Sequence, residues 1–362
     1  MKILYAIQGT GNGHLSRARD IIPLLRKKGN VDVLISGCQV DMSLPFDVKY
    51  CFHGLSFIFG KNGGIDYFET YKRSNLKALF YEVSQLPVTD YDVVISDFEP
   101  VSAWACYIKN KTCIGLSHQL AVINKNAPRP AKADLIGKAV LKYYAPVTHK
   151  YGFHFHSYDK NIFTPVIRES IRNLVSENKG HYCVYLPAYG DAKIIRILAC
   201  FPEVEWRVFS KHCKEEYTQD NIHVVPVQNE LFIDSLSKSE GVLCGAGFET
   251  PAEALFLKKK LMVIPMKGQY EQQCNAAALK AMGVPVLKNL KLKQLKKIHA
   301  WLHDTVVNPV HFPNDTEAIL DVVFSECMKD KKAPVLRDKS INSPSDFRQL
   351  VLKKIFNQLS VK

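Results

Sequence analysis

Residues 244–284 read CGAGFETPAEALFLKKKLMVIPMKGQYEQQCNAAALKAMGV, and this stretch decides the fold. An apolar, β-rich run ends in Gly245-Ala246-Gly247, and a helix is predicted to open near Thr250. A second β-rich run ends near Pro265, and the polar loop 269–272 precedes another helix. Small residues between a strand and a helix expose backbone N–H groups, which attract a diphosphate together with the helix N-terminus. The stretch therefore predicts alternating strands and helices, with an anion-binding turn at the first junction.

The same alternation extends over the whole chain. β-rich runs lie at 2–7, 31–36, 91–96 and 112–117 and again at 181–187, 204–210, 222–227, 241–246 and 260–266, with helix-like segments between most of them. This alternation predicts an α/β fold of two Rossmann-like, doubly wound parallel-sheet domains that face each other across a cleft. We expect a first domain over 1–160, a linker over 161–178, a second domain over 179–335 and a tail helix over 336–362 that packs back on the first domain.

The charge of the chain favours anionic partners. It has 48 Lys and Arg against 35 Asp and Glu, a net charge of +13. Nucleotide diphosphates, polyanionic acceptors and lipid headgroups all fit this charge. Nucleic acid is not expected, because the sequence has no zinc-finger spacing, no aromatic RNA-binding strand and no arginine-rich arm. The lysines of 287–302 form the solvated face of an amphipathic helix whose apolar face is Leu292, Leu295, Ile298 and Leu302, and an anionic membrane surface is left open as its partner.

The chain carries the signs of a cytoplasmic protein. No run approaches the roughly 18 apolar residues of a membrane span, and residues 1–14 resemble a buried strand and its loop rather than a signal peptide. The ten cysteines include no C-x-x-C pair, which is typical of reduced thiols. A peripheral position on the inner face of the membrane is left open.

A first glycine-rich turn, Gly9-Thr10-Gly11-Asn12-Gly13-His14, follows the first β-rich run. A dinucleotide-binding turn needs glycine where this chain has His14 and an acidic residue where it has Ser36, so nicotinamide or flavin binding is disfavoured. A histidine here lies at the carboxyl edge of the sheet, where ligands of open α/β folds bind, and it can take a proton from a hydroxyl group. The alternative is that His14 only caps or packs the helix start.

The strand over 91–96 leads into a polar segment at the same edge. Asp97 is a candidate to support a protonated His14, although it could instead be the N-cap of the helix that contains Pro100. Further polar residues at this edge are candidate acceptor-binding groups: Glu99, His118 and Gln119. In the second half, Thr250 and Glu253 have the spacing of a capping box, so Glu253 could be satisfied by its own helix start.

These elements together resemble the GT-B glycosyltransferases. Within that superfamily the chain is similar to UDP-sugar-dependent small-molecule transferases, to peptidoglycan-precursor N-acetylglucosaminyltransferases, and above all to a prokaryotic group whose first turn resembles 11–14. The resemblance covers both halves in order: the first turn, the strand end at Asp97, the strand end at 226–228, the glycine turn and the loop 269–272. Five ordered elements are far more specific than any one of them.

The resemblance implies roles for these residues. His14 is the base that deprotonates the acceptor hydroxyl, and Asp97 supports it. The nucleotide base contacts 227–228, the diphosphate lies against 245–250, Glu253 binds the ribose, and the loop 269–272 holds the transferred sugar. The implied donor-binding residues are Gly13, Val227, Gln228, Gly245, Ala246, Gly247, Phe248, Glu249, Thr250, Glu253, Gln269, Glu271 and Gln272.

The sequence departs from the plant-type members at two of these positions. They have His in place of Gly245 and Asn in place of Glu249. The first change removes a phosphate contact, and the second puts a negative charge near a diphosphate, so both bear on donor affinity and identity.

The expected reaction is an inverting, metal-independent transfer of a hexose-type sugar from a nucleotide diphosphate sugar, with UDP the expected nucleotide. The acceptor is a hydroxyl group, for example of a lipid or a cell-envelope glycan. No cofactor is expected besides the nucleotide sugar as co-substrate, and no metal, because the only D-x-D sequence, Asp90-Tyr91-Asp92, precedes its strand at the opposite edge of the sheet. The alternatives are a nucleotide-sugar 2-epimerase of the same fold and a non-catalytic nucleotide-sugar or lipid-binding protein; His14 and Glu253 argue against the latter.

Overall fold

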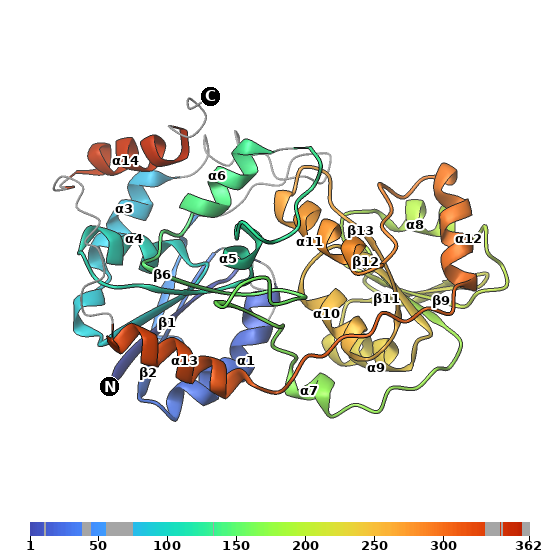
Figure 1. The fold of residues 1–362 in the computed structure, drawn as a ribbon. Helices are drawn as coiled ribbons and strands as arrows, with labels where there is room; N and C mark the ends of the chain where they lie inside the picture. The colour runs from blue at the N-terminus through green and yellow to red at the C-terminus, as the bar shows by residue number, and fades with distance from the viewer. Residues whose placement is uncertain are drawn as a thin grey trace.

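The computed structural model describes residues 1–10, 12–37, 45–55, 75–132, 134–329, 341 and 343–356. Gly11 of the first glycine turn and most of the segment before the last helix therefore lie outside the described residues. The chain forms two lobes, each built on its own sheet with helices on both sides (Figure 1). The predicted α/β class with two largely parallel sheets is confirmed.

The first lobe contains a seven-stranded parallel sheet in the order β3-β2-β1-β4-β5-β6-β7. Its strands are β1 (Lys2–Gln8), β2 (Asn30–Ser36), β3 (Tyr50–Phe52), β4 (Val93–Asp97), β5 (Ile114–Leu116), β6 (His149–Phe153) and β7 (Ile162–Phe163). Its helices are α1 (Asn12–Arg26), α3 (Leu76–Gln85), η1 (Val88–Asp90), α4 (Pro100–Ile108), α5 (His118–Val122) and α6 (Leu135–Tyr143). β1 is almost wholly buried, as its run of apolar residues requires of a strand covered on both faces.

The second lobe contains a six-stranded sheet in the order β10-β11-β9-β8-β12-β13, in which only β10 is antiparallel to its neighbour. Its strands are β8 (Tyr182–Tyr185), β9 (Trp206–Ser210), β10 (Tyr217–Gln219), β11 (Ile222–Pro226), β12 (Gly241–Gly245) and β13 (Lys260–Ile264). The interlobe segment, residues 164–181 between β7 and β8, contains α7 (Glu169–Arg172). The helices of the second lobe are α8 (Asp191–Leu198), α9 (Asn229–Lys238), α10 (Glu249–Phe256), α11 (Tyr270–Ala281), η2 (Leu292–Gln294) and α12 (Leu295–His303).

The strand orders place the polar segments at one edge of each sheet. Strand order reverses between β1 and β4 in the first sheet and between β8 and β12 in the second. Ligands of open α/β sheets bind outside the carboxyl ends of the strands at such a reversal. The register pairs Ile7 of β1 with Asp97 of β4, so the first glycine turn and Asp97 lie at the same edge.

The last two helices return to the first lobe (Figure 1). α13 (Thr316–Lys329) lies along α1, where Lys27 Nζ is 3.1 Å from Glu317 Oε1. α14 (Pro344–Phe356) packs on α3, and its Phe347 is fully buried against Trp104. The tail predicted over 336–362 is described only at 341 and 343–356. The domain limits remain a prediction, and β7 still pairs with the first sheet just beyond residue 160.

The lysine-rich segment differs from its predicted form in one respect. Ile298 and Leu302 are buried as expected, but Leu292 is 55% exposed. The reason is that Leu292 belongs to the short turn η2, whose side chains do not follow the face of α12. None of the helices in the described part of the chain is long and apolar enough to cross a membrane.

Candidate active site

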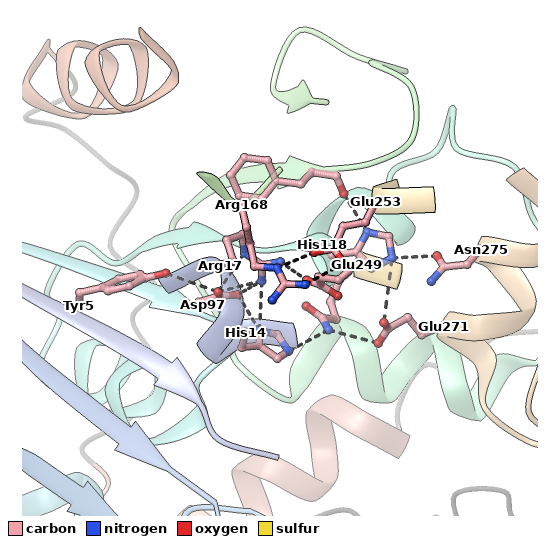
Figure 2. A network of polar contacts seen from close by, with 12 residues as sticks. Tyr5, His14, Arg17, Asp97, His118, Arg168, Glu249, Glu253, Glu271 and Asn275 are labelled. Carbon is pink, nitrogen blue, oxygen red and sulfur yellow. Dashed lines mark hydrogen bonds and ion pairs between the residues drawn. The ribbon is translucent and has the colours of Figure 1, made fainter. Parts of the chain in front are cut away.

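A histidine and a buried aspartate meet at the carboxyl edge of the first sheet. His14 lies in the first turn of α1, and Asp97 is the last residue of β4. The His14 Nδ1 atom is 2.8 Å from Asp97 Oδ1. Nδ1 has two contacts, the Asp97 oxygen at 2.8 Å, which can only accept, and Arg17 Nη2 at 3.2 Å, which can only donate. We assign the hydrogen to Nδ1 from the shorter contact, which leaves the lone pair on Nε2. Figure 2 shows His14 and Asp97 side by side, next to Arg17. The amide Nε2 of Gln119 lies 3.3 Å from His14 Nε2 and donates to it.

Arg17 holds the other side of Asp97 and was not singled out from the sequence. Its Nη2 atom is 2.8 Å from both carboxylate oxygens, and its Nε atom is 3.2 Å from Oδ2. Burial alone would raise the pKa of Asp97, but the charges of Arg17 and His14 outweigh burial and lower it. The sequence signal was present, because a residue three positions after His14 lies on the same face of a helix.

Glu99, and not Asp97, caps helix α4. The Glu99 carboxylate accepts hydrogen bonds from the backbone N–H groups of Val101 at 2.7 Å and Ser102 at 2.6 Å, and from the Ser36 hydroxyl at 2.6 Å. Glu99 is fully buried. The alternative of Asp97 as N-cap is therefore wrong. The Glu99 oxygens have partners inside the first lobe, and a role of Glu99 toward an acceptor stays a prediction.

His118 joins the two lobes. Its Nδ1 atom is 2.8 Å from the Phe153 carbonyl oxygen, and its Nε2 atom is 2.8 Å from Asn275 Oδ1 in α11. The ring also stacks on Phe248, with 3.8 Å between ring centroids. Burial lowers the pKa of His118. The ring is enclosed and both nitrogens have partners inside the protein, and a role of His118 toward an acceptor stays a prediction.

Gln119 lies between the catalytic candidates and the sugar loop. Besides contacting His14, its Nε2 atom is 3.2 Å from Glu271 Oε2 in α11 of the second lobe. Its role toward an acceptor remains a prediction. Gln272 closes the same loop, because its Oε1 atom accepts from the Met266 backbone N–H at 2.9 Å. Gln269 immediately precedes α11.

The glycine turn of the second lobe follows β12 and faces open space. A Cβ atom built on Gly247 would meet nothing within 4 Å, and one on Gly245 would meet only Gln272 Oε1 at 3.8 Å. Ala246 and Phe248 are buried, so only their backbones could meet a ligand. Val227 is half-buried and Gln228 is exposed after β11, at the same edge of the sheet.

The predicted capping box does not form. α10 begins at Glu249, so Thr250 is already inside the helix, and no side chain caps the helix start. Glu253 instead binds Arg168 of the interlobe segment, with Nε to Oε1 at 2.6 Å and Nη2 to Oε2 at 2.9 Å. Arg168 also donates to Asn229 Oδ1 at 3.0 Å. Glu249 reaches the first lobe, where its Oε1 atom is 2.6 Å from Arg17 Nη1.

A cavity of about 530 Å³ opens beside Arg168, between the lobes. Its walls come from α1, from the interlobe segment and from α9, and include Arg19, Asp20, Arg168, Asn229, Glu230 and Ile233. Of its lining residues, Arg168 binds Glu253 and Asn229 follows Gln228 in the sequence. The D-x-D sequence is at the other edge of the first sheet, where the Asp92 carboxylate accepts from the Lys2 backbone N–H at 2.7 Å.

Solved structures of glycosyltransferases share this fold over nearly their whole length. Spinosyn forosaminyltransferase SpnP has a TM-score of 0.53 and 13% identity, covering 98% of this chain and 99% of its own. MurG from Acinetobacter baumannii has a TM-score of 0.54 and 14% identity, covering 90% and 100%. SnogD from Streptomyces nogalater has a TM-score of 0.51 and 14% identity, covering 97% and 99%.

The two lobes with facing sheet edges are those of a GT-B glycosyltransferase. The chain belongs to glycosyl transferase family 1, whose model matches residues 1–304. The resemblance drawn from the sequence is thereby confirmed, and so is the assignment as a transferase that moves a sugar from a nucleotide-sugar donor to an acceptor. None of the curated proteins compared with the chain matches it.

Proposed function

We propose that the protein is an inverting, metal-independent transferase that moves a hexose-type sugar from a nucleotide diphosphate sugar to a hydroxyl acceptor. UDP is the proposed nucleotide, and a lipid or a cell-envelope glycan is the proposed kind of acceptor. The observation that carries this proposal is the pair of His14 and Asp97, 2.8 Å apart, at an edge that faces the second lobe.

The pair suits a general base for a hydroxyl group. Asp97 fixes the tautomer of His14 and stabilises the imidazolium that forms when Nε2 takes the proton. The acceptor oxygen then attacks the anomeric carbon as the bond from that carbon to the diphosphate oxygen breaks. A single displacement of this kind inverts the anomeric configuration. The acceptor hydroxyl takes the place beside Nε2 that Gln119 occupies.

The second lobe supplies the site for the leaving group. The backbone N–H groups of 245–247 and the start of α10 stabilise the departing diphosphate electrostatically. Gly245 and Gly247 leave room for it, since neither would bring a Cβ into close contact with the protein. In this proposal Val227 and Gln228 contact the nucleotide base, and Glu271 and Gln272 contact the transferred sugar.

A binding screen tests the donor first. Thermal unfolding of the protein is followed with UDP, GDP, dTDP and their sugar conjugates, because a ligand that binds only the folded state raises the midpoint. A rise with one nucleotide supports the proposed donor class, and UDP is expected to give it. No rise with any of them would contradict the proposal.

A transfer assay then tests the base. His14→Ala is expected to lower kcat by about 10²–10⁴-fold, the usual contribution of general base catalysis, while the donor-induced midpoint shift is retained. His303→Ala, at an exposed histidine of α12, is the matched control. Full activity of His14→Ala, retention of the anomeric configuration, or loss of turnover in EDTA would each contradict part of the proposal. Turnover of the donor without any acceptor would indicate an epimerase.

A further inference from the structure

Two carboxylates of helix α10 form ion pairs with arginines that lie outside the second lobe. Glu249 and Glu253 are four residues apart on α10, a spacing at which like charges on a helix repel each other. Each is neutralised by an arginine from outside the second lobe: Arg17 of α1 for Glu249 and Arg168 of the interlobe segment for Glu253. The pair of Glu253 and Arg168 lies between the second lobe and the interlobe segment. The Glu249 pair crosses directly from one lobe to the other.

Glu249 is held by two independent features of the first lobe. Its Oε1 atom is 2.6 Å from Arg17 Nη1. Its Oε2 atom lies against Gly13, where an added Cβ would come within 2.5 Å of that oxygen and 2.8 Å of the carboxylate carbon. Real Cβ atoms do not approach so closely, so a side chain at position 13 would displace the Glu249 carboxylate from its present place. The carboxylate is therefore seated on the first turn and not merely near it.

Arg17 connects this carboxylate to the base. The same guanidinium that contacts Glu249 through Nη1 holds Asp97 through Nε and Nη2. The side chain is only 2% exposed. Burial alone would lower the pKa of Arg17, but the charges of Asp97 and Glu249 outweigh burial and raise it, so the guanidinium stays a cation. A planar guanidinium can satisfy two carboxylates at fixed angles, which a lysine ammonium cannot do in the same way.

We propose that Arg17 is a positioning residue for sugar transfer, which holds Asp97 and His14 in the reactive arrangement when Glu249 of the second lobe is docked on it. The inference rests on the proposed function and extends it. In this inference Glu249 docks on Arg17 and does not contact the donor. Because Arg17 neutralises its charge, Glu249 does not repel the diphosphate. Contact between the two lobes then orients the base, His14.

The groups around His14 define a test by pH. They are Asp97 from β4, Arg17 from α1 and Gln119 from α5, with Glu249 of α10 and Glu271 of α11 across the interface. Glu249→Gln removes a negative charge beside Arg17, so the acid limb of the kcat profile should move to lower pH by about half a unit to one unit. Arg17→Met removes the positive charge and should move it to higher pH, with kcat lowered about 100-fold by misplacement of the base.

A second variant covers the case in which Arg17→Met does not fold. Gly13→Ala keeps every charge but displaces the Glu249 carboxylate, so its acid limb should move in the same direction as that of Glu249→Gln. Lys27→Gln is the matched control, because it removes the exposed pair with Glu317 just after the end of α1 and should change neither kcat nor the pH limb. A donor-induced rise in the unfolding midpoint is measured for each variant.

The outcomes separate this inference from the proposed function. If the wild type transfers sugar while Glu249→Gln and Gly13→Ala keep its kcat and pH limb, the inference is overturned and the pair only stabilises the fold. If the wild type transfers nothing, the proposed function fails. The coupling is then tested by NMR of the His14 ring, whose nitrogen chemical shifts should change in Glu249→Gln and in Gly13→Ala, and unchanged shifts overturn the inference.

Discussion

Arg168 binds both carboxylate oxygens of Glu253, at 2.6 and 2.9 Å. The sequence offered two roles for this carboxylate, a contact with the donor ribose and a capping box, and the pair with Arg168 rules out the second. Burial raises the pKa of Glu253, while the charge and hydrogen bonds of Arg168 oppose that rise. Arg168 thus partly offsets the effect of burial on a nearly enclosed carboxylate.

Arg168→Met is expected to destabilise the protein strongly. Glu253 is 3% exposed, and loss of its partner leaves a buried charge without compensation, which costs about 3–5 kcal/mol. The double variant Arg168→Met/Glu253→Met should recover most of this loss, because no unpaired charge remains. Urea unfolding of the two single variants and the double variant measures the coupling. Arg207→Met, which removes an exposed pair with Glu205, should lower the unfolding free energy by less than about 1 kcal/mol. If Arg168→Met lowers it by no more than Arg207→Met does, the prediction for the buried pair is wrong.

Glu99→Ala tests the cap of helix α4. The variant loses the acceptor for Val101 N–H and Ser102 N–H and leaves the buried Ser36 hydroxyl without its partner, so a loss of about 2–4 kcal/mol is expected. Asn75→Ala removes an exposed cap of α3 and should cost only about 1 kcal/mol. Chemical denaturation compares the two. If Glu99→Ala lowers the unfolding free energy no more than Asn75→Ala does, the buried Glu99 carboxylate does not stabilise the start of α4 as predicted.

The predictable parts of this site came from sheet geometry. Parallel strands end at one edge, so the positions of His14 and Asp97 after their strands predicted that the two would meet. The alternative that made Asp97 the cap of α4 fails because the strand continues to Asp97, and Phe98, with a φ of 56°, turns the chain so that Glu99 precedes the helix. A left-handed backbone at a phenylalanine has no sequence signal.

The contacts between the lobes could not be predicted in the same way. Arg168 lies in a segment without regular periodicity, so its partner depends on how the lobes are placed. His118 was predicted to be polar and accessible, but the stacked Phe248 ring from the other lobe encloses it. Local patterns specify each lobe, while the pairs across the interface depend on tertiary structure. The roles assigned to the donor-binding residues remain predictions for the same reason.

Asp97 should make stability depend on pH in the acid range. Its pKa is lowered in the folded protein, so the folded state holds the charged form more tightly than the unfolded state does. The contribution is complete above the ordinary value of about 4 and is lost as pH falls through the lower folded value. The difference in unfolding free energy between the wild type and Asp97→Asn should therefore be largest near pH 6 and shrink below about pH 4. Urea titrations at a series of pH values measure it, and a constant difference would contradict the prediction.

Phe347 should anchor the C-terminal helix to the first lobe. The ring is fully buried, with centroids 5.3 Å from Trp104 and 5.8 Å from Phe80, so Phe347→Ala leaves a cavity and should cost about 3–5 kcal/mol. Phe347→Leu should lose less, because it fills part of the same space. Thermal unfolding gives the ranking, and Trp104 fluorescence should shift to longer wavelength if the helix detaches and water reaches the indole. Val322→Ala, at a position 42% exposed on α13, serves as the control and should change the midpoint little. A Phe347→Ala protein as stable as this control would show that α14 contributes nothing to the first lobe.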